Sequence, residues 1–408
     1  MTLKDFFDAV GFAVGVVAAA ATLMSALRTV VLPRASQGWI PGLTMRATRL
    51  LFSARARHHD DYRQRDVLMA MLAPVALLTM LISWLTVTVA AYSLIFFTVT
   101  SKSIATSIEL SGSSIVTLGT VSDNRFWPSV LGDSEAGVGL LIVALVISYL
   151  PSIYSAFTRR ETGVTLLEMR AGNPPSATTM LVRYRRIEEG MTAEITELWR
   201  QWEQWFADIE ESHTTFPILV FFRSPHGDRS WITAAGTLLD GAALWTSAVE
   251  HPTDPYAQLC LRSGFLALRK IADAFGLFYD RDPEPDDAIT ISRAEWDLAI
   301  DELQKGGVKT VADLDVAWAK WKGWRVNYDT VLLDLARLIE APPAAWVSDR
   351  SPMRVQTARR ASRSTARKAS GHRLGRHLSQ ETPGLSRTDR SRRFEGPVWG
   401  RSRSGRRR

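Results

Sequence analysis

Three long uncharged segments limit what this chain can fold into. They cover residues 9–27, 67–101 and 136–158, which are 19, 35 and 23 residues long. A helix of about 20 apolar residues crosses the hydrocarbon core of a bilayer, and a helix satisfies its own backbone hydrogen bonds there. We therefore predict an all-α integral membrane protein in the lipid bilayer, with three transmembrane helices. Residues 1–33 are predicted to be a retained first helix, because the leading residues hold two Asp and one Lys where a cleaved signal is basic.

The charges of the two connecting loops predict the orientation of these helices. Residues 34–65 hold seven Arg and two Asp, whereas residues 99–135 hold one Lys, one Arg and four acids. Short basic loops stay in the cytoplasm. We therefore expect a multi-pass protein of the plasma membrane with its N-terminus outside. Residues 34–66 form a basic cytoplasmic loop, and everything after the basic pair Arg159–Arg160 is cytoplasmic.

The formal charge of +7 is concentrated at the C-terminal end of the chain. Residues 351–408 contain 16 Arg, one Lys and three acids, so the remaining residues together carry −7. An Arg/Ser-rich composition without periodic apolar residues predicts a disordered tail over residues 347–408. Near the inner leaflet such a tail attracts anionic lipid, and its sequence predicts no specific nucleic-acid partner.

A helical cytoplasmic domain over residues 181–346 is predicted before the tail, after a linker over residues 161–180 that contains two adjacent prolines. Ser292–Glu295 has the pattern of a capping box. The apolar run 214–222 has the composition of a buried strand but is short and solitary, so we expect it to lie in the core. Tryptophans spaced three residues apart predict apolar stripes that pack in a helical core: Trp199, Trp202 and Trp205, and Trp318, Trp321 and Trp324.

The sequence contains no motif that indicates catalysis or metal binding. A Gly-rich phosphate loop, a nucleophile elbow and a His–Glu zinc motif are all missing from it. The acidic run 280–287 lacks the glycine and the final glutamate of a calcium loop. Cys260 is the only cysteine, which excludes an internal disulfide and suits a reducing cytoplasm. We therefore predict a protein that is not an enzyme and that has no metal site and no cofactor.

A polar segment rich in Ser, Thr and Gly lies between the second and third uncharged segments. Residues 101–120, SKSIATSIELSGSSIVTLGT, read as a short helix followed by extended chain. Non-helical backbone at membrane depth occurs only where protein buries it or where it lines a water-filled cavity. A re-entrant loop meets this condition. The carbonyl end of its helix, the carbonyls of its extended part and the Thr117 hydroxyl are oxygen ligands that replace the hydration of a cation.

This segment resembles the filter of an ion channel. The octet SSIVTLGT, residues 113–120, is similar to the filter pattern of two-transmembrane, pore-loop bacterial ion channels of the potassium-channel superfamily. The resemblance covers a span–loop–span unit of about residues 67–160, with the pore helix and filter over residues 103–122. Residue by residue, it implies an ion filter formed by Ser114, Thr117, Leu118, Gly119 and Thr120.

The resemblance also implies a homotetramer around one pore, with a permeant monovalent cation in place of any cofactor. Beyond Gly119 the sequence departs from the pattern, because Thr120 replaces an aromatic residue and Val121 replaces a second glycine. That glycine adopts backbone angles that a β-branched residue avoids. We therefore expect a degenerate filter, which passes monovalent cations and possesses no fixed preference for potassium.

The third uncharged segment is predicted to be the inner helix of this unit. A proline kinks a helix, and aromatic rings narrow its inner mouth, so Tyr149, Pro151 and Tyr154 are gate candidates. The predicted function is a cation channel, with potassium as one candidate ion, and with a regulatory cytoplasmic domain. The alternative is a non-conducting anchor that presents the helical cytoplasmic domain to a partner. The apolar run GLLIVALVIS, residues 139–148, favours this alternative, because a wet cavity is more polar.

Overall fold

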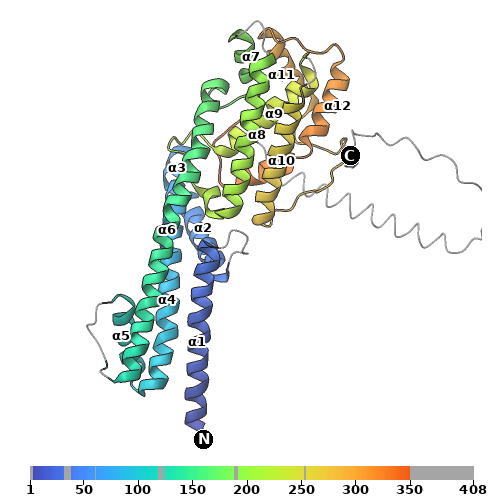
Figure 1. Ribbon diagram of the computed structural model, residues 1–408. Helices are drawn as coiled ribbons and strands as arrows, with labels where there is room; N and C mark the ends of the chain where they lie inside the picture. The colour runs from blue at the N-terminus through green and yellow to red at the C-terminus, as the bar shows by residue number, and fades with distance from the viewer. Residues whose placement is uncertain are drawn as a thin grey trace, which may run out of the picture. The chain divides into compact units, whose positions relative to one another are not determined.

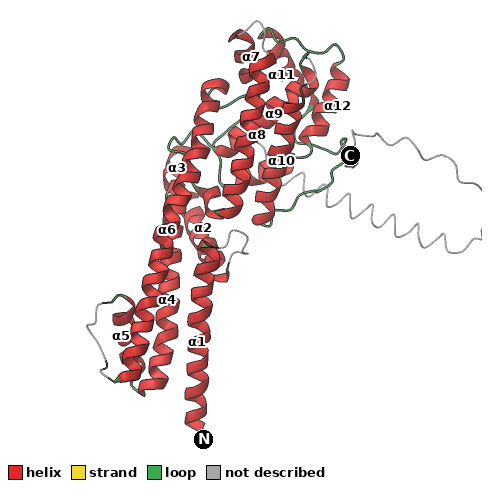
Figure 2. Cartoon of the chain, in the orientation of Figure 1, coloured by secondary structure: helices red, strands yellow, loops and turns green. Residues whose placement is uncertain are grey.

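The computed structural model describes residues 3–31, 38–59, 61–117, 123, 125–187, 192–251 and 254–349. These residues form thirteen α-helices and one 3-10 helix (Figure 2). Within this part of the chain there is no strand, and one isolated antiparallel bridge joins Val249 to Thr310. The prediction of an all-α fold is confirmed for the residues described. The predicted tail lies outside them except for residues 347–349, and the prediction is wrong for Val347, which is buried in the core.

Three helices are long and apolar enough to cross a membrane, as predicted. They are α1 (Leu3–Val30), α4 (Leu72–Thr100) together with the short α3 (Tyr62–Ala70) that precedes it, and α6 (Phe126–Ala171). Their length follows from sequence, because each covers an uncharged segment long enough to span a bilayer, although two of these segments contain a proline, Pro74 and Pro151. The three lie side by side in Figure 1.

Helix α1 packs closely and antiparallel along α4. Near one end of the contact, a Cβ atom on Gly15 would lie 2.8 Å from the carbonyl oxygen of Ala91, so glycine is what permits this approach. Near the other end, Nε1 of Trp84 donates a 3.3 Å hydrogen bond to the hydroxyl of Ser25. Small residues and interhelical hydrogen bonds of this kind hold helices together in lipid, where burial of apolar surface does not.

The outer faces of these helices carry large exposed apolar side chains. Contiguous apolar surface of this kind is covered by lipid or by another protein chain. The exposed side chains include Phe7, Val17, Leu78, Ile82, Leu140, Ile147 and Tyr154.

The C-terminal helices surround a central helix, α9 (Trp231–Ala248), in which every position except Thr246 is buried. A helix that is apolar on all sides belongs in the middle of a core. The helices around it are α7 (Ala177–Ile187), α8 (Thr192–Thr215), α10 (Pro255–Ala274), α11 (Arg293–Lys305), α12 (Leu314–Arg325) and α13 (Asp329–Leu338).

Local predictions for this region can be checked residue by residue. The capping box is present, since Oγ of Ser292 accepts from the backbone N of Glu295 at 3.3 Å and Oε2 of Glu295 accepts from the backbone N of Ser292 at 2.9 Å. The tryptophan stripe on α8 is buried, and Trp321 is buried between two partly exposed neighbours, so both stripes contribute to the core.

The strand-like composition of residues 214–222 does not lead to a strand. Residues 217–221 form the 3-10 helix η1 (Pro217–Phe221), because no described strand is available to pair with them. The predicted core position is confirmed, since Leu219, Val220 and Phe221 are buried.

Helix α6 joins the three helices that are long and apolar enough to cross a membrane, which we call the membrane helices, to the C-terminal helices. It continues to Ala171, so the first residues of the segment predicted as a linker are helical. Its last turns bury Val164 and Leu167 in the same core as α7 to α10. The N-terminal end of α4 and the adjoining helix α2 (Trp39–Ala56) reach this core as well. The C-terminal helices are therefore packed directly on the ends of the membrane helices.

Candidate functional site

The short helix predicted after Ser101 is present as α5 (Ile104–Ile115), and it runs back alongside α4 and α6. Oγ of Ser103 accepts a 3.2 Å hydrogen bond from the backbone N of Thr106 and so caps its first turn. Towards its other end, the hydroxyl of Ser111 shares its one hydrogen between the carbonyl of Val89 in α4, at 3.0 Å, and the carboxylate of Glu135 in α6. Figure 1 shows α5 beside the lower halves of α4 and α6.

The last turn of α5 lies against α6. A Cβ atom on Gly139 would lie 2.9 Å from the carbonyl oxygen of Ile115, so this contact depends on glycine. A Cβ atom on Gly132 would similarly lie 3.1 Å from the hydroxyl of Ser114. The C-terminal end of α5 is thus held well inside the hairpin that α4 and α6 form.

Two of the five predicted filter residues lie in the described part of the chain. The hydroxyl of Ser114 donates to the carbonyl of Leu110 at 2.9 Å, within α5. Thr117 ends the helix with φ of 55°, a left-handed conformation that is uncommon for a β-branched residue. Backbone conformations of this kind are concentrated at functional sites. Leu118, Gly119 and Thr120 lie outside the described residues.

A buried carboxylate lies behind α5 and was missed by the sequence analysis. Glu135 of α6 is fully buried and accepts a hydrogen bond from the hydroxyl of Ser111, while its Oε2 atom has no hydrogen-bond partner among the described residues. The only sequence signal was that Glu135 immediately precedes the third uncharged segment. A buried carboxylate is costly unless it is paired or hydrogen-bonded.

An ion-pair cluster lies at the end of the hairpin where α4 ends and α6 begins. The carboxylate of Asp123 lies 2.7 Å from Nη2 of Arg125 and 2.8 Å from Nζ of Lys102. Hydrogen bonds from Arg125, and next from Lys102, hold the pKa of Asp123 well below its usual range. The start of α5 is therefore tied to the start of α6 by charge.

The three gate candidates do not come together. Tyr149 is buried, and its ring packs edge-on against Phe216 with the centroids 5.3 Å apart. Tyr154 is 69% exposed, and Pro151 is also exposed within an uninterrupted helix. Tyr149 therefore contacts the C-terminal region, whereas Tyr154 points away from it.

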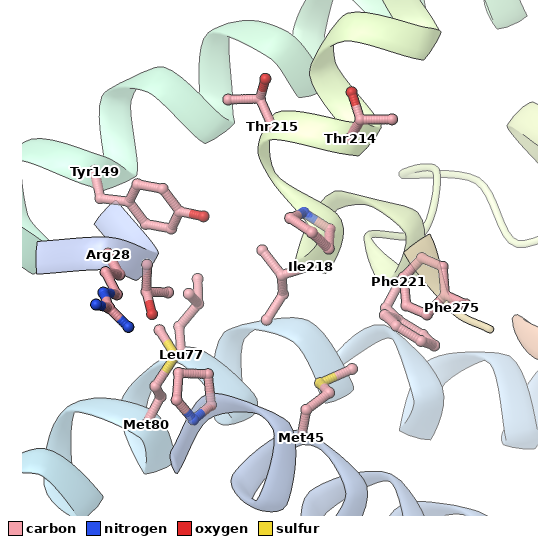
Figure 3. A pocket seen from close by; sticks show the side chains of 13 residues that line it. Arg28, Met45, Leu77, Met80, Tyr149, Thr214, Thr215, Ile218, Phe221 and Phe275 are labelled. Atoms are coloured by element: carbon pink, nitrogen blue, oxygen red, sulfur yellow. The ribbon is translucent and has the colours of Figure 1, made fainter. Parts of the chain in front are cut away.

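Tyr149 also lines a small apolar pocket between the membrane helices and the C-terminal helices. The pocket has a volume of about 70 Å³. Figure 3 shows Tyr149 on one side, with Ile218 of η1 facing it across the pocket and Met80 of α4 below. Residues from α1, α2, α4 and α6 meet η1 here, so a shift of η1 changes the surroundings of several membrane helices at once.

Arg160 fixes α6 to this junction. Its side chain is fully buried and donates to the carbonyl of Leu219 at 2.9 Å and to the carbonyl of Phe222 at 2.7 Å. The charge is paired with Glu161, with Nη2 and Oε1 2.8 Å apart. The indole of Trp205 in turn donates to the backbone carbonyl of Arg160 at 3.2 Å. The charge-assisted hydrogen bonds of the Arg160 guanidinium join α6 to η1 and Phe222, and the indole of Trp205 joins α6 to α8.

Comparisons of the chain with family models, with curated proteins and with solved structures gave no match. The described residues contain no cluster of His, Cys, Asp and Glu that is suited to a metal ion.

Proposed function

We propose that this protein is a cation channel whose pore is formed by the segment between α4 and α6. The observation that carries the proposal is the position of α5, which turns back from the end of α4 and places its carbonyl end near Gly139 of α6. With α4 and α6 in a bilayer, that end lies at membrane depth. The negative end of a helix dipole and the oxygens of Ser114 and Thr117 favour a cation there.

The pore requires more than one chain, and we propose a homotetramer. One copy supplies a single α5 and leaves large apolar side chains of α6 exposed, among them Leu140 and Ile147. Copies related by a rotation axis bury such faces against one another and bring their filter segments to that axis. The filter then holds Ser114, Thr117 and the three residues that follow.

The C-terminal helices have a regulatory role in this proposal and lie in the cytoplasm. Helix α6 runs unbroken from the hairpin to Arg160, whose side chain is bound to Leu219 and Phe222. A rearrangement of the C-terminal helices therefore moves the inner end of α6. Pro151 and Tyr154 remain gate candidates on the exposed face of α6, whereas Tyr149 belongs to the junction.

The test is monovalent cation flux through liposomes that contain the purified protein. We expect flux with the natural sequence and none with Gly119→Trp, which fills the filter. The matched control is Gly42→Trp on α2, where a Cβ atom meets open space, and it should conduct. Absence of flux at varied pH and voltage, together with a monomeric mass in detergent, would instead establish a non-conducting anchor for the C-terminal helices.

A further inference from the structure

A second cavity lies where α2 and α3 meet α13. Its volume is about 540 Å³. Five arginines and two acids contribute to its lining, which leaves a net charge of +3. The charged lining residues are Arg49, Arg57, Arg65, Arg223, Arg337, Asp66 and Glu340.

Arg223 connects two walls of the cavity and neutralises Asp66, one of its two acids. Arg223 pairs with the carboxylate of Asp66 through Nη1. Its Nη2 donates to the backbone carbonyls of Ile339 at 2.6 Å and Glu340 at 3.1 Å. Glu340 has φ of 51°, and this left-handed turn aims both carbonyls at the guanidinium. The negative charge of Asp66 is therefore already neutralised by a residue of the wall.

Three of the other arginines, Arg49, Arg57 and Arg65, are less well matched. Arg49 is half-buried, and Glu340 is the acid that acts on it. Nε of Arg65 is buried and has no hydrogen-bond partner among the described residues. Arg57 lies at the end of α2, exposed at the rim. Buried donors in proteins are almost always paired, so Arg65 lacks an acceptor that a bound anion supplies.

We propose that this cavity binds a phosphate-bearing anion. Guanidinium groups present paired N–H donors that match the oxygens of a phosphate, and several arginines around one cavity stabilise more than one negative charge. The anion bridges α2 and α3 to α13 and so strengthens the junction. The site is independent of whether the segment between α4 and α6 conducts.

The phosphate can belong either to a membrane lipid or to a soluble compound. Arg65 and Asp66 immediately precede the uncharged segment that begins at Val67, so the cavity lies at the level of lipid headgroups when α4 spans a bilayer. A phospholipid with an exposed phosphate, or a soluble phosphate compound, therefore reaches the same arginines. Inorganic pyrophosphate probes the soluble source, and phosphatidic acid probes the lipid source.

The test uses the full chain, so that the basic tail is the same in every variant. Arg57→Gln/Arg65→Gln removes two cavity arginines. Arg46→Gln/Arg55→Gln is the matched control, because it removes the same charge from exposed positions of α2 outside the cavity. Binding is read as slower amide hydrogen exchange in α2, α3 and α13, in detergent with pyrophosphate and in phosphatidylcholine vesicles with or without 10% phosphatidic acid.

We expect one of the two probes to slow amide exchange in α2, α3 and α13 of the natural protein. The cavity variant should bind that probe at least about tenfold more weakly, and the control variant should bind it normally. Arg57→Gln alone, at an exposed position, keeps the test usable if the double variant does not fold. Failure of both probes, or equal loss in both double variants, would overturn the proposal.

Discussion

The buried guanidinium of Arg160 donates a 2.9 Å hydrogen bond to the backbone carbonyl of Leu219, 59 residues further along the chain. Arg160 belongs to a membrane helix and Leu219 to η1 of the C-terminal region. Because the charge is buried, this contact cannot be exchanged for water without a large cost. It is one of several contacts that can couple the two regions, together with the pair of Arg223 and Asp66.

Arg160→Met should weaken this junction. The substitution leaves the carbonyls of Leu219 and Phe222 without their donor and Glu161 without its partner, so we expect a loss of about 3–5 kcal/mol in the free energy of unfolding. Chemical denaturation in detergent measures it. The control is Arg159→Met at the adjacent exposed position, with an expected change within about 0.5 kcal/mol. Equal losses in the two variants would contradict the role given to Arg160.

Ser111 and Glu135 should be energetically coupled, because their hydrogen bond docks α5 on α6. A double-mutant cycle with Ser111→Ala and Glu135→Ala should give a coupling free energy of about 0.5–3 kcal/mol. Each single variant should also speed amide exchange over residues 104–117. Glu109→Ala changes an exposed acid of the same helix and should have neither effect. Additive single effects would show that the pair does not hold α5.

Stability should fall as pH decreases through the range of a normal histidine, because of His213. Burial, and next the charge of Arg160, hold the pKa of His213 well below its usual value, so it stays neutral in the folded protein. Below about pH 6.5 the imidazole of His213 takes up a proton in the unfolded chain but stays neutral in the folded chain. The free energy of unfolding then drops by up to about 1.4 kcal/mol per pH unit.

Comparison with His213→Gln isolates this contribution. Unfolding measured from pH 7.5 to pH 5 should show a steeper fall in the natural protein than in the variant. A constant difference between the two over this range would mean that His213 does not titrate on unfolding.

Arg325→Met should destabilise the C-terminal helices. Arg325 is fully buried, with Nη1 at 2.6 Å from Oδ1 of Asp240 and Nε at 2.9 Å from Oδ1 of Asp329. Burial opposes its charge, but the two carboxylates outweigh burial and raise the pKa of Arg325. Its loss leaves two buried acids without a positive charge beside them. We therefore expect the free energy of unfolding to fall by about 3–5 kcal/mol, measured by thermal or chemical unfolding.

The control for Arg325 is the exposed pair of Arg281 and Asp273, which lie 2.9 Å apart. Arg281→Met should lower the free energy of unfolding by no more than about 1 kcal/mol, because water and salt screen an exposed pair. A similar cost for both arginines would indicate that the buried network contributes little beyond an ordinary surface contact.

Local features were readable from the sequence, whereas the candidate site was readable only in part. The short helix after Ser101 follows from its capping serine and its composition, and the Ser292–Glu295 box is a contact between near neighbours. Glu135 was missed because its burial depends on α5 folding back over it. Tyr149 was expected in a gate, but the packing of η1 decides where its ring lies.

The sequence by itself determined the three apolar helices, because a bilayer admits long uncharged segments only as structures that satisfy their own backbone. It also determined the capping box at Ser292–Glu295 and the tryptophan stripes, which depend on residues a few positions apart. Only the tertiary structure decided the junction. Arg160 meets Leu219 across 59 residues and Arg223 meets Asp66 across 157, and contacts over such separations depend on how all the intervening helices pack.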